Sequence, residues 1–266
     1  RRDWLSLRLQ MAAGTWLDFL ASPLAPVFVA VVFLIGGSLY LLHEYRKAQS
    51  MRTAYHSAKF WDKRYATIIE NGIPGQEWYF LDGEIMDIIE RVAKQNDKIH
   101  DLGCGQSMLC DRLRAKGFKN LSASDFSTVV IESRTLDEKK RLKMQGAAEM
   151  GEIKYVECDL RKDLPDEESS VTVVVDKATL DAIIHRRDEK CKQDAQAVLR
   201  QASRLLKPGG VLVSISLNND EVWNRYCSNP HLVPAEPTSH LVRVIDAGQP
   251  KPTKANIYIR RFKRGN

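Results

Sequence analysis

The 266-residue chain is poor in cysteine and has no cysteine pair at the two-residue spacing of a metal or redox motif. The cysteines present are Cys104, Cys110, Cys158, Cys191 and Cys227, an odd number that does not suit a disulfide framework. No His/Cys cluster has zinc spacing, so no metal site is expected. These absences favour a reducing compartment and a core without covalent or metal crosslinks.

The chain also lacks an array of basic and aromatic residues, although its net charge is +6. Its densest basic cluster is RRFKRGN, residues 260–266. We interpret this cluster as a solvated tail, with contact to anionic lipid or an acidic partner as the alternative. Nucleic acid is therefore not an expected partner.

Charged side chains are absent from residues 19–42, FLASPLAPVFVAVVFLIGGSLYLL. Roughly 20 apolar residues cross a bilayer as a helix, whereas a core helix of this length normally keeps a polar face. We therefore predict a single transmembrane helix with membrane lipid as its partner. Basic residues flank the span on both sides, so the positive-inside comparison leaves the orientation open.

This span divides the chain into four predicted parts. They are an amphipathic segment 1–18, the transmembrane helix 19–42, a helical stalk 43–59 and a domain 60–266. In the domain, short apolar strands alternate with helices such as TVVIESRTLDEKKRLKMQ, and SHLVRVIDAG and KANIYIRRF can close it as an antiparallel hairpin. This order is typical of a doubly wound, mostly parallel α/β sheet.

Four predicted strands end in polar or glycine residues. These are Asp101, Gly103 and Gly105 after the first strand, Asp125 after the second, Asp159 after the third, and Asp176 and Lys177 after the fourth. The carboxyl ends of parallel strands meet at one edge of the sheet, where doubly wound folds bind ligands. We therefore expect these residues to surround one crevice.

The glycines indicate a nucleotide-like ligand but do not name it. Gly103 and Gly105 allow close approach of backbone and ligand, but a dinucleotide fingerprint would have a third glycine where Met108 stands. No phosphate-binding loop with a lysine after its last glycine occurs, so a nucleoside triphosphate is not expected. Asp125 is placed to bind ribose hydroxyls.

A nucleoside without phosphates therefore fits this pattern best, and S-adenosylmethionine is such a ligand. Its ribose would meet Asp125, its adenine would meet Asp159 and Leu160, and its amino-acid end would lie over the glycine loop.

The motifs DLGCGQSML, SASDFSTVVI, VECDLRKDLP and VVVDKATLDAI resemble, in order and spacing, those of the seven-β-strand class I methyltransferases. Upstream, FWDKRY and EWYF resemble the subfamily of the elongation factor 1-alpha lysine methyltransferases and the mitochondrial citrate synthase lysine methyltransferase. The resemblance covers roughly residues 60–217. It implies a Rossmann-like fold and S-adenosylmethionine as cofactor.

The resemblance also implies a set of cofactor contacts. They are Trp61, Tyr65, Trp78, Gly103, Asp125, Phe126, Asp159, Leu160 and Lys177. Aromatic faces attract cations, and the sulfonium is one. Core packing is the alternative for the two tryptophans, a surface position for the lysine, and a helix cap for Asp125.

Three features depart from the family pattern. The family often has DKGT where this chain has DKAT, so Ala178 could narrow the channel or forbid a positive φ. The segment after the fifth strand is short, so the choice of substrate does not carry over. A transmembrane span lies outside the usual family plan.

Asp176 and Asp181 are the candidate catalytic residues, because they lie near the predicted edge of the fourth strand. His185 is a third candidate, with a solvent-facing position as its alternative. A lysine substrate must lose a proton before it can accept a methyl group, since its ordinary pKa is about 10.4.

These observations favour a membrane-anchored, S-adenosylmethionine-dependent methyltransferase that acts on a protein lysine. One alternative is an inactive, methyltransferase-like accessory subunit of a membrane complex, for example a respiratory one. Another is a methyltransferase for a small lipid-soluble molecule such as a quinone. We expect a single-pass protein of the mitochondrial inner membrane or another intracellular membrane.

Overall fold

The structure is a computed structural model that describes residues 36–43, 54–72, 77–79, 82–145, 151–162, 168–245 and 253–265. The chain forms two compact units, Arg1–Arg52 and Thr53–Asn266. In the first unit, the described residues form a helix from 36 to 43. The predicted segment 1–18, most of the predicted span 19–42 and most of the predicted stalk 43–59 lie outside the described residues.

One observation bears on membrane insertion. Across the described ranges, no helix combines the length and the apolar composition that crossing a bilayer requires.

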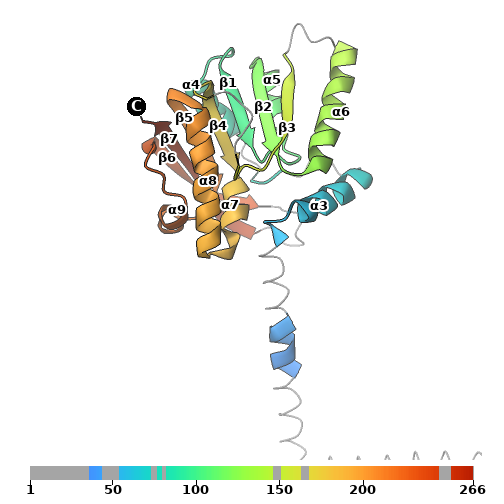
Figure 1. The fold of residues 1–266 in the computed structure, drawn as a ribbon, viewed down its shortest axis with the longest axis vertical. Helices are drawn as coiled ribbons and strands as arrows, with labels where there is room; N and C mark the ends of the chain where they lie inside the picture. The colour runs from blue at the N-terminus through green and yellow to red at the C-terminus, as the bar shows by residue number, and fades with distance from the viewer. Residues whose placement is uncertain are drawn as a thin grey trace, which may run out of the picture. The chain divides into compact units, whose positions relative to one another are not determined.

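A seven-stranded sheet forms the centre of the second unit (Figure 1). Its strand order is β3-β2-β1-β4-β5-β7-β6. Strands β1 to β5 are parallel, and β7 runs antiparallel to both β5 and β6. The doubly wound sheet and the closing hairpin predicted from the sequence are therefore confirmed. The strands are β1 Lys98–Leu102, β2 Asn120–Asp125, β3 Ile153–Glu157, β4 Val171–Lys177, β5 Leu206–Ser216, β6 Leu232–Ile245 and β7 Thr253–Arg264.

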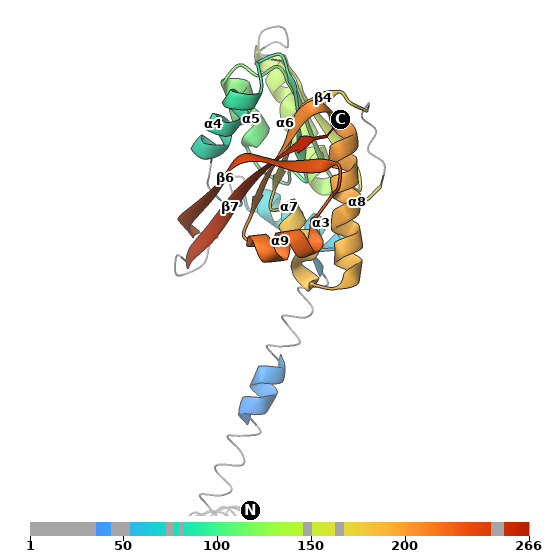
Figure 2. The same ribbon diagram turned by 90° about the vertical axis from the view of Figure 1, so that its left-hand side faces the viewer.

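Helices cover both faces of the sheet, with α4 and α5 on one side and α8 on the other (Figure 2). Helix α8 is amphipathic and buries Ala195, Val198, Leu199 and Ala202 on one stripe. The described helices of this unit are α3 Ala58–Glu70, α4 Asp82–Val92, α5 Leu109–Ala115, α6 Thr128–Gln145, α7 Thr179–Ile183, the 3₁₀ turn η1 Ile184–Arg186, α8 Glu189–Leu205 and α9 Asp220–Tyr226.

Strand β4 separates two hydrophobic clusters. Val173 and Val175 pack in the cluster that includes α4 and α5, and Val174 packs in the cluster that includes α8. Successive side chains of a strand point to opposite faces, so a strand covered on both faces is apolar along its whole length.

The basic cluster at residues 260–266 is not a solvated tail over most of its length. Residues up to Arg264 belong to β7, and Arg260 and Arg261 are buried. Arg260 can be buried here because its guanidinium donates to the Asn218 carbonyl and to the Asp220 carboxylate. The interpretation as a tail is therefore wrong, since the cluster forms part of a strand that has a neighbour on each side.

The strand order places the switch point between β1 and β4. From β1 the chain proceeds through β2 to β3 in one direction, and later from β4 to β5 in the other. Helix α3 precedes the sheet in the chain and is joined to α6 by the Ser127 hydroxyl, which donates to Asp62 at 2.6 Å. The ends of the central strands and α3 thus enclose the place where a ligand is expected.

Candidate functional site

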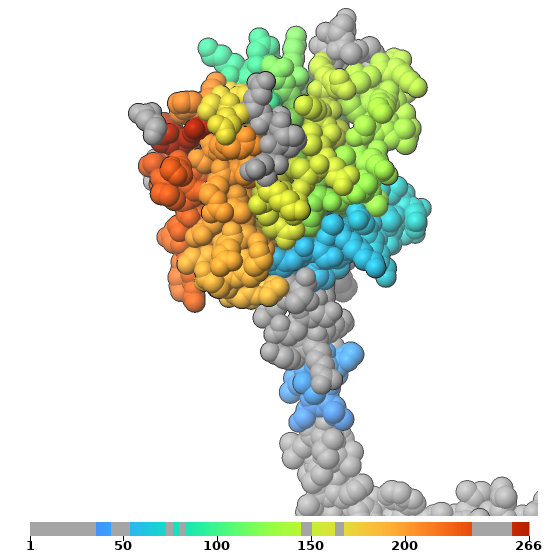
Figure 3. Space-filling model, viewed as in Figure 1, coloured from blue at the N-terminus to red at the C-terminus, as the bar shows by residue number. Residues whose placement is uncertain are grey.

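A cavity of about 500 Å³ opens where the parallel strands end. Every residue predicted to bind the cofactor lines it. They are Trp61, Tyr65, Trp78, Asp101, Gly103, Gly105, Asp125, Phe126, Asp159, Leu160 and Lys177. In Figure 3, α3 lies beside the chain that follows β3 and beside the α7–α8 region. The structure thus brings the predicted residues together, while their binding roles stay predictions.

The glycine loop after β1 is shaped by its protein neighbours as well as by space for a ligand. Gly103 and Gly105 have φ of +64° and +50°, a region that favours glycine. A Cβ at Gly103 would collide with the Thr179 side chain, and one at Gly105 would lie 2.6 Å from the Tyr65 hydroxyl oxygen. The Thr179 hydroxyl donates to the Leu102 carbonyl at 2.8 Å, which ties the turn after β4 to the end of β1.

Asp125 fixes this loop to the end of β2. Its carboxylate accepts the backbone N–H of Gly105 and that of Ser127, each at 2.9 Å. Burial raises the pKa of Asp125 to about 6, although these amides act in the opposite direction. A carboxylate has about four acceptor positions, so Asp125 can still accept the hydroxyls of a ribose.

Asp101 lies on the floor of the cavity at the end of β1 and is 2% exposed. Burial raises its pKa to about 7, against the effect of the nearby Lys177 ammonium. A bound ligand can therefore change whether the Asp101 carboxyl is protonated near neutral pH.

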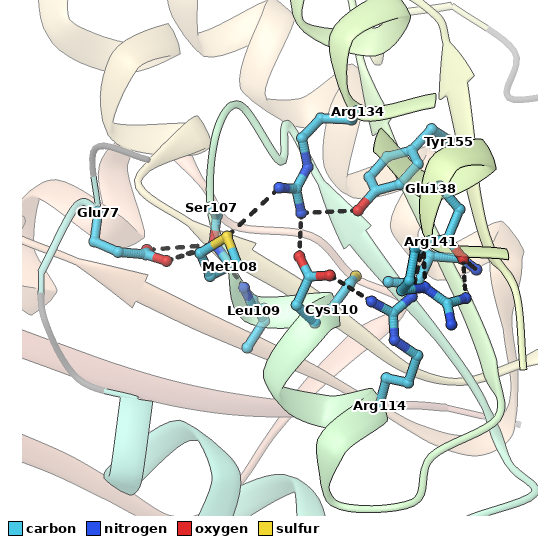
Figure 4. A network of polar contacts seen from close by, with 12 residues as sticks. Glu77, Ser107, Met108, Leu109, Cys110, Arg114, Arg134, Glu138, Arg141 and Tyr155 are labelled. Carbon is cyan, nitrogen blue, oxygen red and sulfur yellow. Dashed lines mark hydrogen bonds and ion pairs between the residues drawn. The ribbon is translucent and has the colours of Figure 1, made fainter. Parts of the chain in front are cut away.

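Glu77 is a site residue that sequence reasoning missed. Its carboxylate forms a buried ion pair with Lys177, N···O 2.5 Å, and accepts the backbone N–H of Met108 at 2.6 Å. The Ser107 hydroxyl also donates to it, and Figure 4 shows Glu77 reaching this start of α5. Burial raises the pKa of Glu77, but Lys177 and the Met108 amide outweigh burial and lower it.

Two consequences follow from this arrangement. The Lys177 ammonium is bound to Glu77, so it holds the segment 77–79 in the cavity wall instead of pointing freely at a ligand. The Glu77 carboxylate also accepts the backbone N–H of Met108. In a dinucleotide-binding fold, the N–H groups at this start of the helix would face a diphosphate. This agrees with the prediction of a ligand without phosphates.

At the end of β3, Asp159 is held by Arg161, which sequence reasoning also missed. The guanidinium donates to both carboxylate oxygens, with Nε···Oδ1 at 2.7 Å and Nη2···Oδ2 at 2.9 Å. Burial raises the pKa of Asp159, but these bonds outweigh it and lower the pKa. An adenine amino group at Asp159 would therefore share the carboxylate with an arginine.

Stacked aromatic rings form one wall. The ring of Trp61 stacks on Tyr65 and on Tyr55, with centroids 5.6 Å apart in each pair. The Trp61 indole N–H donates to the Tyr55 carbonyl at 3.0 Å, so the stack is fixed in place. Trp61 and Tyr65 both pack in the core and line the cavity. Core packing therefore holds for Trp61, while the cofactor contacts of both residues stay predictions.

Comparison with known proteins assigns this domain. Residues 100–214 match the methyltransferase domain family. The eEF1A lysine and N-terminal methyltransferase of Bos taurus is 29% identical over 172 residues, which are 64% of this chain but 23% of that protein. The EEF1A lysine methyltransferase 4 of Mus musculus is 28% identical over 169 residues, 61% of each chain.

Solved structures share the fold. An S-adenosylmethionine-dependent methyltransferase from Methanosarcina mazei has a TM-score of 0.50 at 14% identity, over 67% of this chain and 97% of that one. The cyclase SpnF has a TM-score of 0.53 at 10% identity, over 80% of this chain and 97% of that one. At such identities the likeness concerns the fold alone.

The chain contains a class I, S-adenosylmethionine-dependent methyltransferase domain. The match to the methyltransferase domain family confirms the predicted cofactor, S-adenosylmethionine. The cavity fits it chemically, because the Asp125 carboxylate, the glycine loop after β1 and an aromatic wall lie together there. The sequence has no phosphate-binding loop. The family match begins at residue 100, so it does not include the residues of α3 and of the segment 77–79 that line the cavity.

Of the two predicted catalytic residues, Asp176 is not among the residues that line the cavity. It is 1% exposed, and its carboxylate accepts the Ser214 hydroxyl at 2.5 Å and the Leu180 backbone N–H at 3.0 Å. Burial raises its pKa to about 7. Asp176 thus joins β4 to β5 and to α7, and its side chain is not placed to contact a substrate in the cavity.

Asp181 does line the cavity. Its carboxylate accepts four hydrogen bonds, from Tyr79, Ser216, Leu217 and Asn218. These use all the acceptor positions of a carboxylate, so Asp181 is occupied by the protein itself. This arrangement favours a role in holding its neighbours over a role as a base.

His185 lies at the mouth of the methyltransferase cavity and is exposed, with its ring edge-to-face on Tyr55 at 5.0 Å. The exposed position agrees with the solvent-facing alternative for this residue.

Ala178, the departure from the family motif, does not prevent the turn after β4. Its φ is +69°, so the alanine adopts the left-handed conformation that it was expected to forbid. Its backbone N–H donates to the Ile215 carbonyl at 3.1 Å, which holds the turn against β5. A forbidden positive φ is therefore wrong, because tertiary hydrogen bonding outweighs a local strain of about 1–2 kcal/mol. The alternative, that Ala178 narrows the channel, stays a prediction.

Proposed function

We propose that this methyltransferase domain transfers a methyl group to the amine of a protein lysine. The observation that carries the proposal is the extent of the cavity. It holds all the predicted cofactor contacts and continues over the ends of β4 and β5 to Tyr79, Leu217 and Asn218. The curated relatives, named as eEF1A lysine methyltransferases, support lysine as the acceptor.

When bound, S-adenosylmethionine would supply an electrophilic methyl carbon: the lone pair of the neutral amine forms the new N–C bond, the C–S electron pair passes to sulfur, and the positive charge moves to nitrogen. The proton of the lysine ammonium leaves to solvent before this step. The protein contributes mainly position. Asp125 holds the ribose end against the glycine loop, and Trp61 and Tyr65 form the wall beside it. Alignment of two bound reactants can lower a barrier by about 7–11 kcal/mol.

An accessory, non-transferring role is the second candidate, because one observation favours it. The cyclase SpnF has the same fold, so the fold by itself does not imply methyl transfer. A small lipid-soluble acceptor is a further candidate for the same cavity, since the cavity wall is rich in aromatic rings.

Anchoring to a membrane through residues 19–42 belongs to the proposal as well. Its support is the absence of charge from that segment. Extraction of membranes with alkaline carbonate tests it on the full chain, with a chain lacking residues 1–52 as the control. Full-length protein in the soluble fraction would contradict the anchor.

The main experiment has two stages. Calorimetry with S-adenosylhomocysteine should detect binding by the full chain and at least a tenfold loss with Asp125→Asn, whereas the exposed Asp137→Asn control should bind normally. Transfer of a labelled methyl group into a cell lysate should then place the label in protein, on lysine. Label in the lipid extract would favour the small-molecule reaction, and binding without any transfer would favour the accessory role.

A further inference from the structure

The end of the cavity over β4 and β5 lies away from most of the predicted cofactor contacts, with Lys177 at the end of β4 as the exception. The glycine loop, Asp125 and Asp159 follow β1, β2 and β3, which lie next to one another in the sheet. The methyl acceptor must therefore approach from the other side, over the ends of β4 and β5. Tyr79 and Asp181 line the cavity on that side.

Tyr79 is held there by an unusual combination of contacts. Its hydroxyl donates to Asp181 Oδ2 at 2.7 Å, across 102 residues of sequence. The residue is 4% exposed and has a φ of +63°, which is rare for a bulky side chain. Non-glycine residues in this conformation persist only where the surrounding structure enforces them, and they cluster at functional sites.

The direction of the hydrogen bond decides what Tyr79 can offer. Asp181 Oδ1 is occupied by Ser216 and Asn218, and Oδ2 is shared by Tyr79 and the Leu217 amide. An ionised carboxylate can only accept, so the phenol proton is committed to Asp181. The phenol oxygen keeps its lone pairs, and Tyr79 is among the residues that line the cavity.

The same contacts keep the phenol neutral. Burial raises the pKa of Tyr79 well above its ordinary value, and the charge of Asp181 acts in the same direction. Tyr79 is therefore not a base. It is a fixed, uncharged hydrogen-bond acceptor at the acceptor end of the cavity.

We propose that the Tyr79 oxygen accepts an N–H hydrogen bond from the amine that receives the methyl group, and that Asp181 positions Tyr79 for this contact. The inference rests on the proposed function and narrows the substrate to amines that keep an N–H beside the lone pair. With that N–H held by Tyr79, the lone pair of the nitrogen is turned toward the methyl carbon. Tyr79 is thus a catalytic residue, and Asp181 is a positioning residue.

Two ligands allow the proposed hydrogen bond to Tyr79 to be tested separately from binding of the rest of the cofactor. S-adenosylhomocysteine has no group at the methyl position, whereas sinefungin carries an amine on carbon there. Both should bind the full chain, and the amine of sinefungin should donate to Tyr79. Hydrogen bonds to charged groups contribute enough to change affinity by about tenfold to a hundredfold.

Calorimetry of Tyr79→Phe should therefore show sinefungin bound at least tenfold more weakly, with S-adenosylhomocysteine within about threefold of the wild type. Tyr155→Phe is the matched control, because it removes a hydroxyl that accepts from Arg134 outside the cavity. This control should bind both ligands normally. Equal sinefungin binding by Tyr79→Phe and the wild type would overturn the inference.

A second variant protects the test if Tyr79→Phe does not fold. Asp181→Asn weakens the hold on the phenol proton and leaves the ring in place, so it should reduce sinefungin affinity more than S-adenosylhomocysteine affinity. Equal changes for the two ligands would contradict the positioning role. Absence of S-adenosylhomocysteine binding by the wild type would instead count against the proposed function, so the two failures are distinguishable.

Discussion

The ammonium of Lys177, at the end of β4, donates to the carboxylate of Glu77, 100 residues earlier in the chain. Each side chain is 5% exposed. The pair attaches the segment 77–79, which carries Trp78 and Tyr79, to the centre of the sheet. This buried ion pair therefore holds part of the cavity wall, together with the hydrogen bond from Tyr79 to Asp181.

Removing one partner of this pair should be costly. Glu77→Gln should lower the free energy of unfolding by about 3–5 kcal/mol, because it leaves the Lys177 charge buried without its counterion. Denaturant unfolding of the full chain measures this. The exposed pair of Lys116 and Glu90 is the control, and Glu90→Gln should cost less than about 1 kcal/mol. Similar costs for the two variants would contradict the structural role of the buried pair.

Alanine substitutions at Gly103 and Gly72 distinguish the cost of backbone strain from the cost of steric crowding. Both have a positive φ, but a Cβ at Gly72 meets nothing within 4 Å, whereas one at Gly103 collides with Thr179. Gly72→Ala should cost about 1–2 kcal/mol of unfolding free energy, and Gly103→Ala should cost more by about 1–3 kcal/mol. Adding Thr179→Ala to Gly103→Ala should recover part of the excess. Lack of any recovery would show that crowding by Thr179 is not the cause.

Ala178→Gly should stabilise the domain. Glycine at a φ of +69° removes a strain of about 1–2 kcal/mol and loses about 0.5–1 kcal/mol through greater freedom of the unfolded chain. Thermal unfolding should therefore show a small rise in Tm. Ala182→Gly, inside α7, is the control and should lower Tm. A fall in Tm for Ala178→Gly would mean that packing of the alanine methyl group stabilises the fold by more than the backbone strain costs.

Stability should depend on pH through Asp101. Its pKa is about 7 in the fold and about 3.9 in the unfolded chain, so between these values the folded state binds more protons. The free energy of unfolding should therefore fall as pH rises from about 4 to 7, at up to about 1.4 kcal/mol per pH unit, and then level off.

Comparison with Asp101→Asn isolates this contribution. The stability of the wild type relative to the variant, measured by denaturant unfolding, should decrease between pH 4 and 7. Lys177, Glu77, Asp176 and Asp125 act on the same carboxyl, and they are present in both proteins. A difference that stays constant with pH would contradict the raised pKa.

The parts of the fold that were predictable are those set by local sequence. Helix α6 occupies the residues of the predicted segment TVVIESRTLDEKKRLKMQ. Its exposed positions are mostly charged, while Val130 and Ile131 near its start are buried. The strand ends were predictable for a similar reason. Each apolar run stops at a polar or glycine residue, and Asp101, Asp125 and Asp159 meet at one cavity as expected.

The remaining features depend on partners far apart in the chain. Asp176 ends its strand like the other acids, yet it bonds Ser214 instead of facing the cavity, and only the strand pairing decides this. Glu77 is part of the EWYF motif, but its partner Lys177 is 100 residues away. The pair can be recognised only when the position of β4 in the sheet is known. Arg161 could have been found, because a basic residue two positions after Asp159 is a local signal.

The aromatic stack of Trp61 and Tyr65 on α3, and Glu77, the partner of Lys177, lie before residue 100, where the family match begins. A fragment cut to residues 100–214 would keep the glycine loop and every acid at the strand ends. It would lose the side of the cavity formed by α3 and the segment 77–79. That side includes Tyr79, which we propose accepts a hydrogen bond from the acceptor amine. For this protein, the smallest piece worth assaying starts upstream of Tyr55.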